Sequence, residues 1–418
     1  MLAYAGRVST SLAAMHTETP PSPARLVFLD WVRIIAFFIL VLYHVGMYYV
    51  SWDWHLKSEF AGSALDPFMV LSAPWRLGLL FLVSGVVSQA MLRRLGILAF
   101  LRRRTLRLLL PLLFGALVIV PPQSYIEVVH DVGYDGGYLR FIGRFLTGYG
   151  GFCDHDGCLF LPTWNHLWFL PYLWMYCLVL AALAACADGR LDTAARTLAR
   201  HLGGWRLLVL PAVFLALARV TMLRHFGETH MLVDDWFAHA TYLYLFLLGA
   251  LLGRAPQCWP RFAAMRWQAL ALAATAWAAT VCWYRLLGLF PDAAGTPTWF
   301  ALMGAVYALL AWSAIVAACG FARRHLHHDG PARAYLATAV LPVYLVHQTL
   351  IIVLAWLLRP ARLAPGIEAP VLVVLTLTLS FGLYEAVRRV SFLRPLFGLP
   401  LASRGATPRS QEQSSLPA

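Results

Sequence analysis

Long apolar runs decide what this chain can fold into. Runs of about 18–22 apolar residues recur along it, each long enough to cross roughly 30 Å of hydrocarbon. Since lipid offers no partners to backbone groups, each run should form a helix, and a membrane barrel would show short alternating segments instead. The sequence therefore predicts an all-α, polytopic membrane protein with about ten transmembrane helices. We place them at 33–50, 75–92, 108–126, 166–186, 206–222, 236–253, 267–287, 298–320, 335–358 and 370–387.

The basic residues predict the orientation of these spans. The formal net charge is +13, although only 13% of the 418 residues are charged. With the N-terminus inside, the cytoplasmic pieces hold 23 of the 33 Lys and Arg residues and the outer loops hold six. This asymmetry predicts two cytoplasmic termini and a multi-pass protein of the cell inner (plasma) membrane. It also explains the net positive charge through topology and contact with membrane lipids, without a nucleic-acid partner.

The two ends of the chain differ from the rest in composition. Residues 1–24 are polar and have no apolar core, which predicts a disordered cytoplasmic leader and not a cleavable signal. Residues 399–418 are also low in hydrophobicity and predict a disordered cytoplasmic tail. The transmembrane domain is accordingly expected over 25–398.

The first span, in "FLDWVRIIAFFILVLYHVGMYYV", carries ionisable residues that most spans avoid. At about 100° per residue, Arg33 and His44 share a face and lie about 16 Å apart along the helix axis. Asp30 lies on the same side and can pair with Arg33. Asp30 and Arg33 have a simpler role as interfacial anchors. His44 lies among apolar residues and is a functional candidate, with a purely structural hydrogen bond as the alternative.

Other spans also carry polar groups. His347 and Gln348 interrupt the apolar ninth span in "LPVYLVHQTLIIVLAWLL", and a second buried histidine suggests a shared polar cavity. Ser84 and Gly85 in "FLVSG" offer a hydroxyl, although such a small pair usually serves helix packing. Asn165, His166 and Trp168 open the fourth span at the depth of the expected cavity, and an interfacial aromatic belt is the simpler interpretation.

Two predicted loops carry residues of the kind that bind ligands. In "CDHDGC", Cys153 and Cys158 lack the C-x2-C spacing and second ligand pair of a zinc site. We expect a disulfide there, free thiols as the alternative, and no metal site in the chain. The basic run of Arg102, Arg103, Arg104 and Arg107 can bind phosphate oxygens, or can simply set topology and contact lipid headgroups.

Several of these stretches together resemble a known family. Arg33 and His44 read R-x10-H, and with the preceding "LDWVR" this resembles the first helix of membrane-bound acyltransferase family 3. The resemblance covers about 28–390, and four further stretches resemble the family in the right order: "FLVSG" at 81–85, "FLRRRTLRLLLP" at 100–111, "HLWFL" at 166–170 and "VYLVHQ" at 343–348.

Within that family the chain is most similar to one group. "LDWVR", "VPPQSYIE" at 120–127 and "NHLWFL" resemble the glucan biosynthesis protein C group, which attaches succinyl to periplasmic glucans. Many family members carry an acidic residue after the Trp-containing motif, and "WFLPYLWMYC" has none. That departure bears on the subgroup more than on membership.

The resemblance implies an acyltransferase-3-like domain over 25–398 that moves an acyl group from cytoplasmic acyl-CoA to a carbohydrate hydroxyl outside. Acyl-CoA is then a co-substrate, and no bound cofactor is expected. His44 is the expected general base, because a sugar hydroxyl is a poor nucleophile at neutral pH. Asp30 and Arg33 would order the inner end or meet the donor. His347 would stabilise the oxyanion, orient the sugar or hold the cavity shape. The expected substrate-binding residues are Ser84, Arg104, Arg107, Gln123, Tyr125, Asn165, His166, Trp168 and Gln348.

A transporter or flippase is the rival interpretation, because a buried arginine and two histidines can also serve a proton relay. Such proteins often show repeated halves and paired broken helices, and the sequence displays neither.

Overall fold

A computed structural model describes residues 26–154 and 157–401, and the regular secondary structure of these residues is helical. Ten of the described helices are long and apolar enough to cross a membrane. Isolated bridges, but no strand, occur within the described ranges. The prediction of an all-α chain with about ten transmembrane helices is therefore confirmed. The predicted leader and most of the predicted tail lie outside the described residues. Leu399, where the tail was expected to begin, is buried in the core.

The long helices, with their bounds, follow the chain in the order of the apolar runs. They are α1 (Val27–Met47), α3 (Arg76–Leu95), α4 (Ile97–Phe114), α7 (Phe169–His201), α8 (Trp205–Phe226), α9 (Trp236–Arg254), α11 (Arg266–Leu289), α13 (Pro297–His325), α14 (Pro331–Leu358) and α15 (Pro365–Arg389). The short helices are α2 (Asp66–Ser72), α5 (Pro121–Asp131), α6 (Tyr138–Leu146), α10 (Trp259–Ala264) and α12 (Pro291–Ala294). Single turns lie at Ser63–Leu65, Asn165–Trp168, Pro256–Cys258, Arg359–Ala361 and Pro395–Phe397.

The third span differs most from its predicted bounds of 108–126. It begins at Ile97, so the basic run lies on helix α4 itself and not before it. It then passes through a wide π turn, Gly115–Ile119, and continues as α5 from Pro121. Proline has no N–H to donate, so Pro121 and Pro122 break the regular ladder of hydrogen bonds there. The sequence did not predict the first turns of this helix, because charged residues lower the hydropathy of a candidate span even where the helix continues beyond the lipid.

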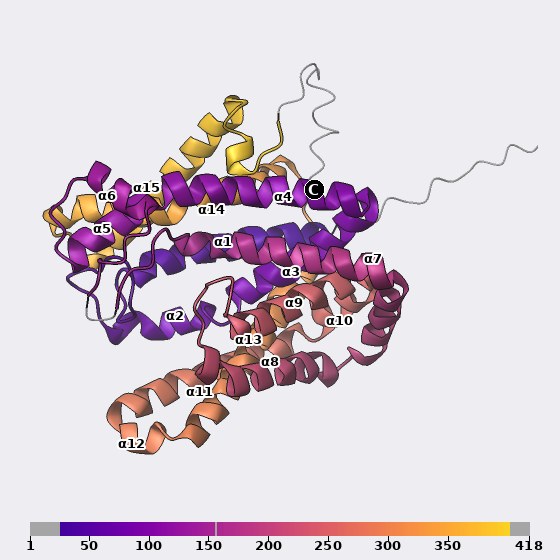
Figure 1. The fold of residues 1–418 in the computed structure, drawn as a ribbon. Coiled ribbons are helices and arrows are strands. Elements are labelled where there is room, and N and C mark those ends of the chain that lie inside the picture. Colours follow the sequence, from indigo (N-terminus) through magenta and orange to yellow (C-terminus); the bar gives the residue numbers. More distant parts are fainter. Residues whose placement is uncertain (1–25, 155–156, 402–418) are drawn as a thin grey trace, which may run out of the picture.

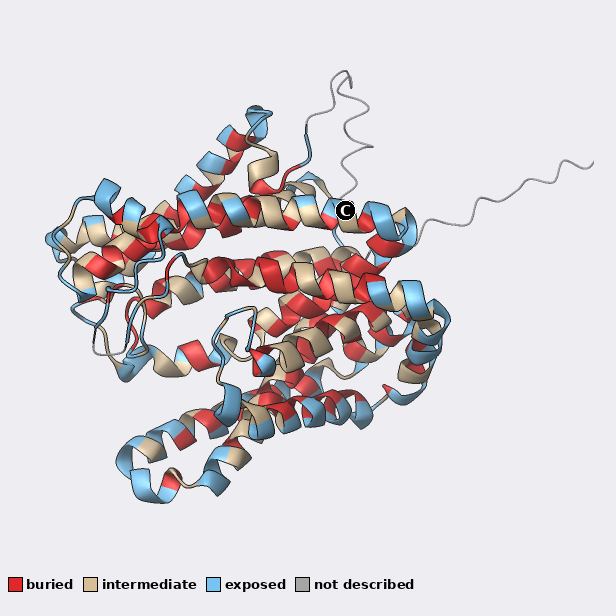
Figure 2. Ribbon diagram, viewed as in Figure 1, coloured by how far each residue is buried: buried red, intermediate tan, exposed pale blue. Residues whose placement is uncertain are grey.

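Helix α1 lies between two groups of helices (Figure 1). Its C-terminal half packs with α4, α5, α7, α14 and α15 around one hydrophobic cluster, which includes Phe37 and Val41. Its N-terminal half packs with α3, α8, α9, α10 and α13 around a second cluster, which includes Phe28 and Val32. Figure 2 shows the buried residues gathered along these central helices, and the exposed ones along the outer faces and the loops. Residues on α1 are therefore placed where the two groups meet.

Helices α3 and α9 approach each other at backbone distance. A Cβ on Gly85 would lie 1.9 Å from the carbonyl oxygen of Phe246, and one on Gly249 would lie 2.0 Å from that of Leu82. Only glycine fits at both positions, so Gly85 serves the helix packing expected of the Ser84–Gly85 pair.

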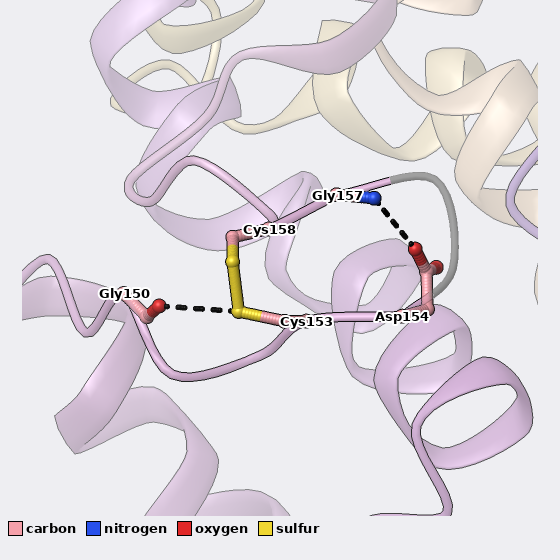
Figure 3. Close-up of a disulfide and its surroundings, with 5 residues drawn as sticks. All are labelled: Gly150, Cys153, Asp154, Gly157 and Cys158. Carbon is pink, nitrogen blue, oxygen red and sulfur yellow. Dashed lines mark hydrogen bonds between the residues drawn. A yellow bond between two sulfur atoms is a disulfide. The ribbon is translucent and has the colours of Figure 1, made fainter.

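A disulfide joins Cys153 to Cys158 in the loop between α6 and α7 (Figure 3). Next to it, the amide of Gly157 donates to the carboxylate of Asp154. The expected disulfide is thereby confirmed.

Candidate active site

His44 on α1 and His347 on α14 form a direct pair. Nδ1 of His44 lies 2.8 Å from Nε2 of His347, and the two rings are nearly parallel with centroids 5.0 Å apart. His347 is fully buried and His44 is half-buried. The two intramembrane histidines therefore lie in direct contact, and the predicted polar cavity around them stays a prediction.

The hydrogen bonds of this pair determine where the protons lie. Nδ1 of His347 is 2.7 Å from the carbonyl oxygen of Tyr344, which can only accept, so this nitrogen carries the proton. Nε2 of a neutral His347 is then an acceptor and takes the N–H from Nδ1 of His44. Two imidazoles this close do not both carry a positive charge in a buried site. Nε2 of His44 is thus left as a proton acceptor.

A third histidine and a buried amide network adjoin the pair. The rings of His166 and His347 meet edge to face at 5.2 Å, and Nε2 of His166 donates to the carbonyl oxygen of Leu345 at 3.2 Å. Nδ1 of His166 then accepts from the amide of Gln123 at 3.4 Å. The hydroxyl of Tyr344 donates to the carbonyl oxygen of His166. These contacts fix the position of the His347 helix relative to the start of α7.

Gln123 on α5 is the centre of this network. Its amide nitrogen also donates to Thr349 at 2.6 Å, and its carbonyl oxygen accepts from Asn165 at 3.2 Å and Gln348 at 3.1 Å. Gln123 is fully buried, so each of these bonds replaces one that water would otherwise supply. Four of the predicted substrate-binding residues, Gln123, Asn165, His166 and Gln348, are thereby brought together beside His347.

Asp30 and Arg33 lie near the N-terminal ends of the same two helices. Asp30 pairs with Arg333 of α14 at 2.6 Å and with Arg33 at 3.6 Å. Arg33 also donates to the carbonyl oxygen of Ala337 at 3.1 Å. Arg333 is buried and pairs with Asp329 as well. The geometry thus gives Asp30 and Arg33 a clear role in joining α1 to α14, away from the histidines.

The basic residues of α4 divide into two kinds. Arg104 is buried and donates to Ser88 of α3 at 2.8 Å, while Arg102 and Arg103 are exposed. Arg107 is half-buried and within electrostatic reach of Arg104 and Arg33. Positive charge therefore gathers in the N-terminal halves of α1 and α4.

Three predicted residues lie apart from the histidine pair. Trp168 stacks on His230 with ring centroids 4.1 Å apart. The hydroxyl of Tyr125 donates to the carbonyl oxygen of Gly136 in the following loop. Ser84 is half-buried beside the glycine contact of α3 and α9.

Sequence reasoning missed Arg333 and Thr349 as members of these networks. Arg333 looked like a residue of a cytoplasmic connection, and its partner Asp30 is 303 positions away in the sequence. The one local signal for Thr349 is its place next to His347 and Gln348 in "VHQT".

The loop after α1 carries a further charged contact. Nδ1 of His55 lies 2.8 Å from the Glu127 carboxylate. Burial by itself lowers the pKa of His55, but the charge and hydrogen bond of Glu127, with Asp53 and Asp131, outweigh it and raise that pKa. This contact ties the loop after α1 to α5, which carries Gln123.

Comparisons with known proteins give one match. A family model described as an acyltransferase domain matches residues 26–385, nearly the whole described chain. Neither the comparison with curated proteins nor that with solved structures found a match. The match confirms the resemblance at the level of the family, and the glucan biosynthesis protein C group stays a prediction.

Proposed function

The chain belongs to this acyltransferase family, and from that membership we propose that it transfers succinyl or acetyl from cytoplasmic acyl-CoA to a carbohydrate hydroxyl on the outer side. It is a multi-pass membrane acyltransferase. The observation that carries the proposal is the histidine pair, because its hydrogen bonds leave Nε2 of His44 as a proton acceptor.

The chemistry follows from that acceptor. Nε2 of His44 takes the proton of the sugar hydroxyl while the hydroxyl oxygen attacks the thioester carbonyl. A tetrahedral oxyanion forms; it collapses by breaking the carbon–sulfur bond, and the ester stays on the sugar. The CoA thiolate leaves and recovers the proton from the His44 imidazolium. His347 is the positioning residue, since its bond to the Tyr344 carbonyl decides which nitrogen of His44 is the base.

The donor would enter from the inner side. Arg102 and Arg103 are exposed there and are free to meet phosphate oxygens, which guanidinium groups match well. Arg104 already donates to Ser88, so its role would be to shape the entrance and not to make the primary phosphate contact. Along α1, Arg33 and His44 lie about 16 Å apart, a distance that the long pantetheine arm of CoA suits.

The acceptor would meet the histidines at the outer ends of α1 and α14. Buried amides and histidines of the Gln123 network are the groups that hydrogen-bond sugar hydroxyls. The resemblance of "VPPQSYIE" and "NHLWFL" to the glucan biosynthesis protein C group supports a periplasmic glucan as acceptor and succinyl as the acyl group.

The test compares wild type, His44→Ala and a matched control, His225→Ala. His225 is exposed at the end of α8. Membranes with equal amounts of each protein receive radiolabelled succinyl-CoA or acetyl-CoA, and label is counted in the carbohydrate fraction. We expect transfer with wild type and the control, and a loss of about 10²-fold or more with His44→Ala. Equal transfer by His44→Ala would overturn the role of His44. Label that crosses sealed vesicles without becoming bound to carbohydrate would favour the transporter interpretation.

A further inference from the structure

A partly open pocket with polar groups in its wall lies on the Tyr43 side of α1. It has a volume of about 250 Å³ and is lined by residues of α1, α2, α3, α8, α9, α11 and α13 and of the loops beside them. The polar side chains in its wall include Tyr43, Arg76, Arg219, Glu228, His230 and Tyr307.

Arg76 is the most unusual of these residues. Its side chain is 5% exposed, and its guanidinium carbon lies 3.2 Å from the centre of the Tyr43 ring. Nε and Nη1 have no hydrogen-bond partner among the described residues. The aromatic face stabilises the charge but does not satisfy the N–H donors. A buried guanidinium with unsatisfied donors is costly, so a ligand that accepts from it has a clear energetic basis.

The charges in the wall do not balance. Arg219 is the second cation, 3.9 Å from the centre of the Tyr307 ring. Burial by itself raises the pKa of the Glu228 carboxyl, but His230 and the hydroxyl of Tyr242, with the charge of Arg219, outweigh it and hold that pKa below its usual value. Glu228 is therefore ionised, and its carboxylate accepts from Tyr242 at 2.8 Å. Two guanidinium groups thus face one carboxylate in the described wall of the pocket.

This pocket is joined to the reacting centre through Tyr43. The Tyr43 ring, which Arg76 covers, meets the ring of its neighbour His44 at 5.8 Å. Arg76 also acts electrostatically on His44. Arg76 is thus separated from His44 by a single side chain, which is our basis for linking a group held at Arg76 to the molecule that reacts at His44.

We propose that Arg76 and Arg219 form an oxyanion-binding pocket that holds a carboxylate or phosphate of the substrate reacting at His44. This assignment rests on the proposed acyl transfer. The oxyanion has two possible sources: the far carboxylate of a dicarboxylic acyl group, or an acidic group on the carbohydrate acceptor. In both cases guanidinium donors match the paired oxygens of the ligand.

The first part of the test measures binding without turnover. Purified full-length protein in lipid nanodiscs is heated with succinate or methyl phosphate, at ionic strength matched by sodium chloride. We expect either anion to raise the melting temperature of wild type and of Arg140→Gln, an exposed arginine on α6, but not that of Arg76→Gln. Arg219→Gln should lose most of the shift. Arg76→Lys keeps the charge and serves as the second variant should Arg76→Gln not fold.

The second part identifies the source of the oxyanion. If it is the acyl group, Arg76→Gln lowers the ratio of succinyl to acetyl transfer about tenfold or more on a neutral oligosaccharide. If the oxyanion belongs to the acceptor, Arg76→Gln lowers the ratio of transfer to an acidic oligosaccharide over transfer to a neutral one. The expected factor is similar, with acetyl-CoA as donor. Either result supports the pocket and names its ligand.

Two results would overturn the pocket. One is the absence of any shift with both anions on wild type. The other is an anion shift that Arg76→Gln abolishes while both transfer ratios stay within about twofold of wild type, since the bound anion is then not part of the substrate. Failure of the proposed function gives a different pattern. Wild type then transfers nothing from either donor, whereas the binding measurement still decides whether the pocket takes an oxyanion.

Discussion

His44 and His347 lie 2.8 Å apart although 303 positions separate them in the sequence. Asp30 and Arg333 meet at the N-terminal end of the same two helices with the same separation of 303 positions. Helices α1 and α14 therefore run parallel and in register, with an ion pair at one end and the histidine pair at the other. The ion pair fixes the register on which the histidine contact depends.

The histidine pair should behave as one unit. His44→Ala removes the base and should lower transfer about 10²-fold or more. His347→Ala leaves the base but frees its tautomer, so we expect a loss of about 10- to 10²-fold in kcat with KM little changed. The double variant should lose hardly more than His44→Ala, as measured by initial rates of label transfer. A double loss equal to the product of the two single losses would show that the residues act independently.

Two buried glutamines offer a matched pair for stability. Gln123 makes four hydrogen bonds, whereas the side-chain amide of Gln89 has no partner within the described ranges. Gln123→Leu leaves the partners of Gln123 without these hydrogen bonds and should lower the free energy of unfolding by roughly 1–3 kcal/mol or more. Gln89→Leu should be neutral or stabilising, because it removes an unsatisfied buried amide. Thermal unfolding in detergent at one pH compares them, and an equal loss in both variants would contradict this view of the network.

The contact of His55 with Glu127 should make stability depend on pH. The pKa of His55 is raised in the folded protein above its ordinary value of 6.5. Protonated His55 therefore contributes stability that is fully present below about pH 6.5 and is lost as the pH rises through the folded pKa. Wild type should lose stability relative to His55→Gln across that window, as followed by denaturation at a series of pH values. A constant difference between the two proteins would contradict the ion pair.

The disulfide provides a test of the predicted orientation. In intact spheroplasts, an impermeant maleimide should label Cys153 and Cys158 only after an impermeant reductant, because the two are bonded to each other. Cys186 is exposed next to the kink of α7 at Ala187, where the predicted fourth span ends, and should react only after permeabilisation. A Cys282→Ser background removes the other exposed thiol. The reverse pattern would place the termini outside.

The fold was largely predictable because lipid permits so few structures. Ten apolar runs give ten helices, and the alternating arginines predict their orientation, which stays a prediction. The irregular third span was not predictable in its details. The arginines of α4 and the prolines at the start of α5 each weaken a hydropathy signal, yet neighbouring helices and the π turn keep the backbone bonded through both.

The candidate site was predictable in its parts but not in its connections. His44 and His347 stood out because an apolar run tolerates few ionisable residues. Arg76 and Arg219 were visible as arginines in or beside spans, but their link to Glu228 and Tyr307 depends on contacts between distant helices. The same is true of Arg333, which no local pattern distinguishes from a loop arginine that sets topology.

The register of α1 and α14 also has a consequence for biosynthesis. The first span is synthesised and inserted long before the ninth, so His44 and Asp30 are in the bilayer through most of translation. Two of their partners, His347 and Arg333, arrive only when α14 inserts, and α1 can take its final place only then. In a nascent chain that stalls before the ninth span, His44 lacks His347 and Asp30 lacks Arg333, in a span that is still incompletely packed. Quality-control proteases of the membrane would find such a chain easy to distinguish from a finished one.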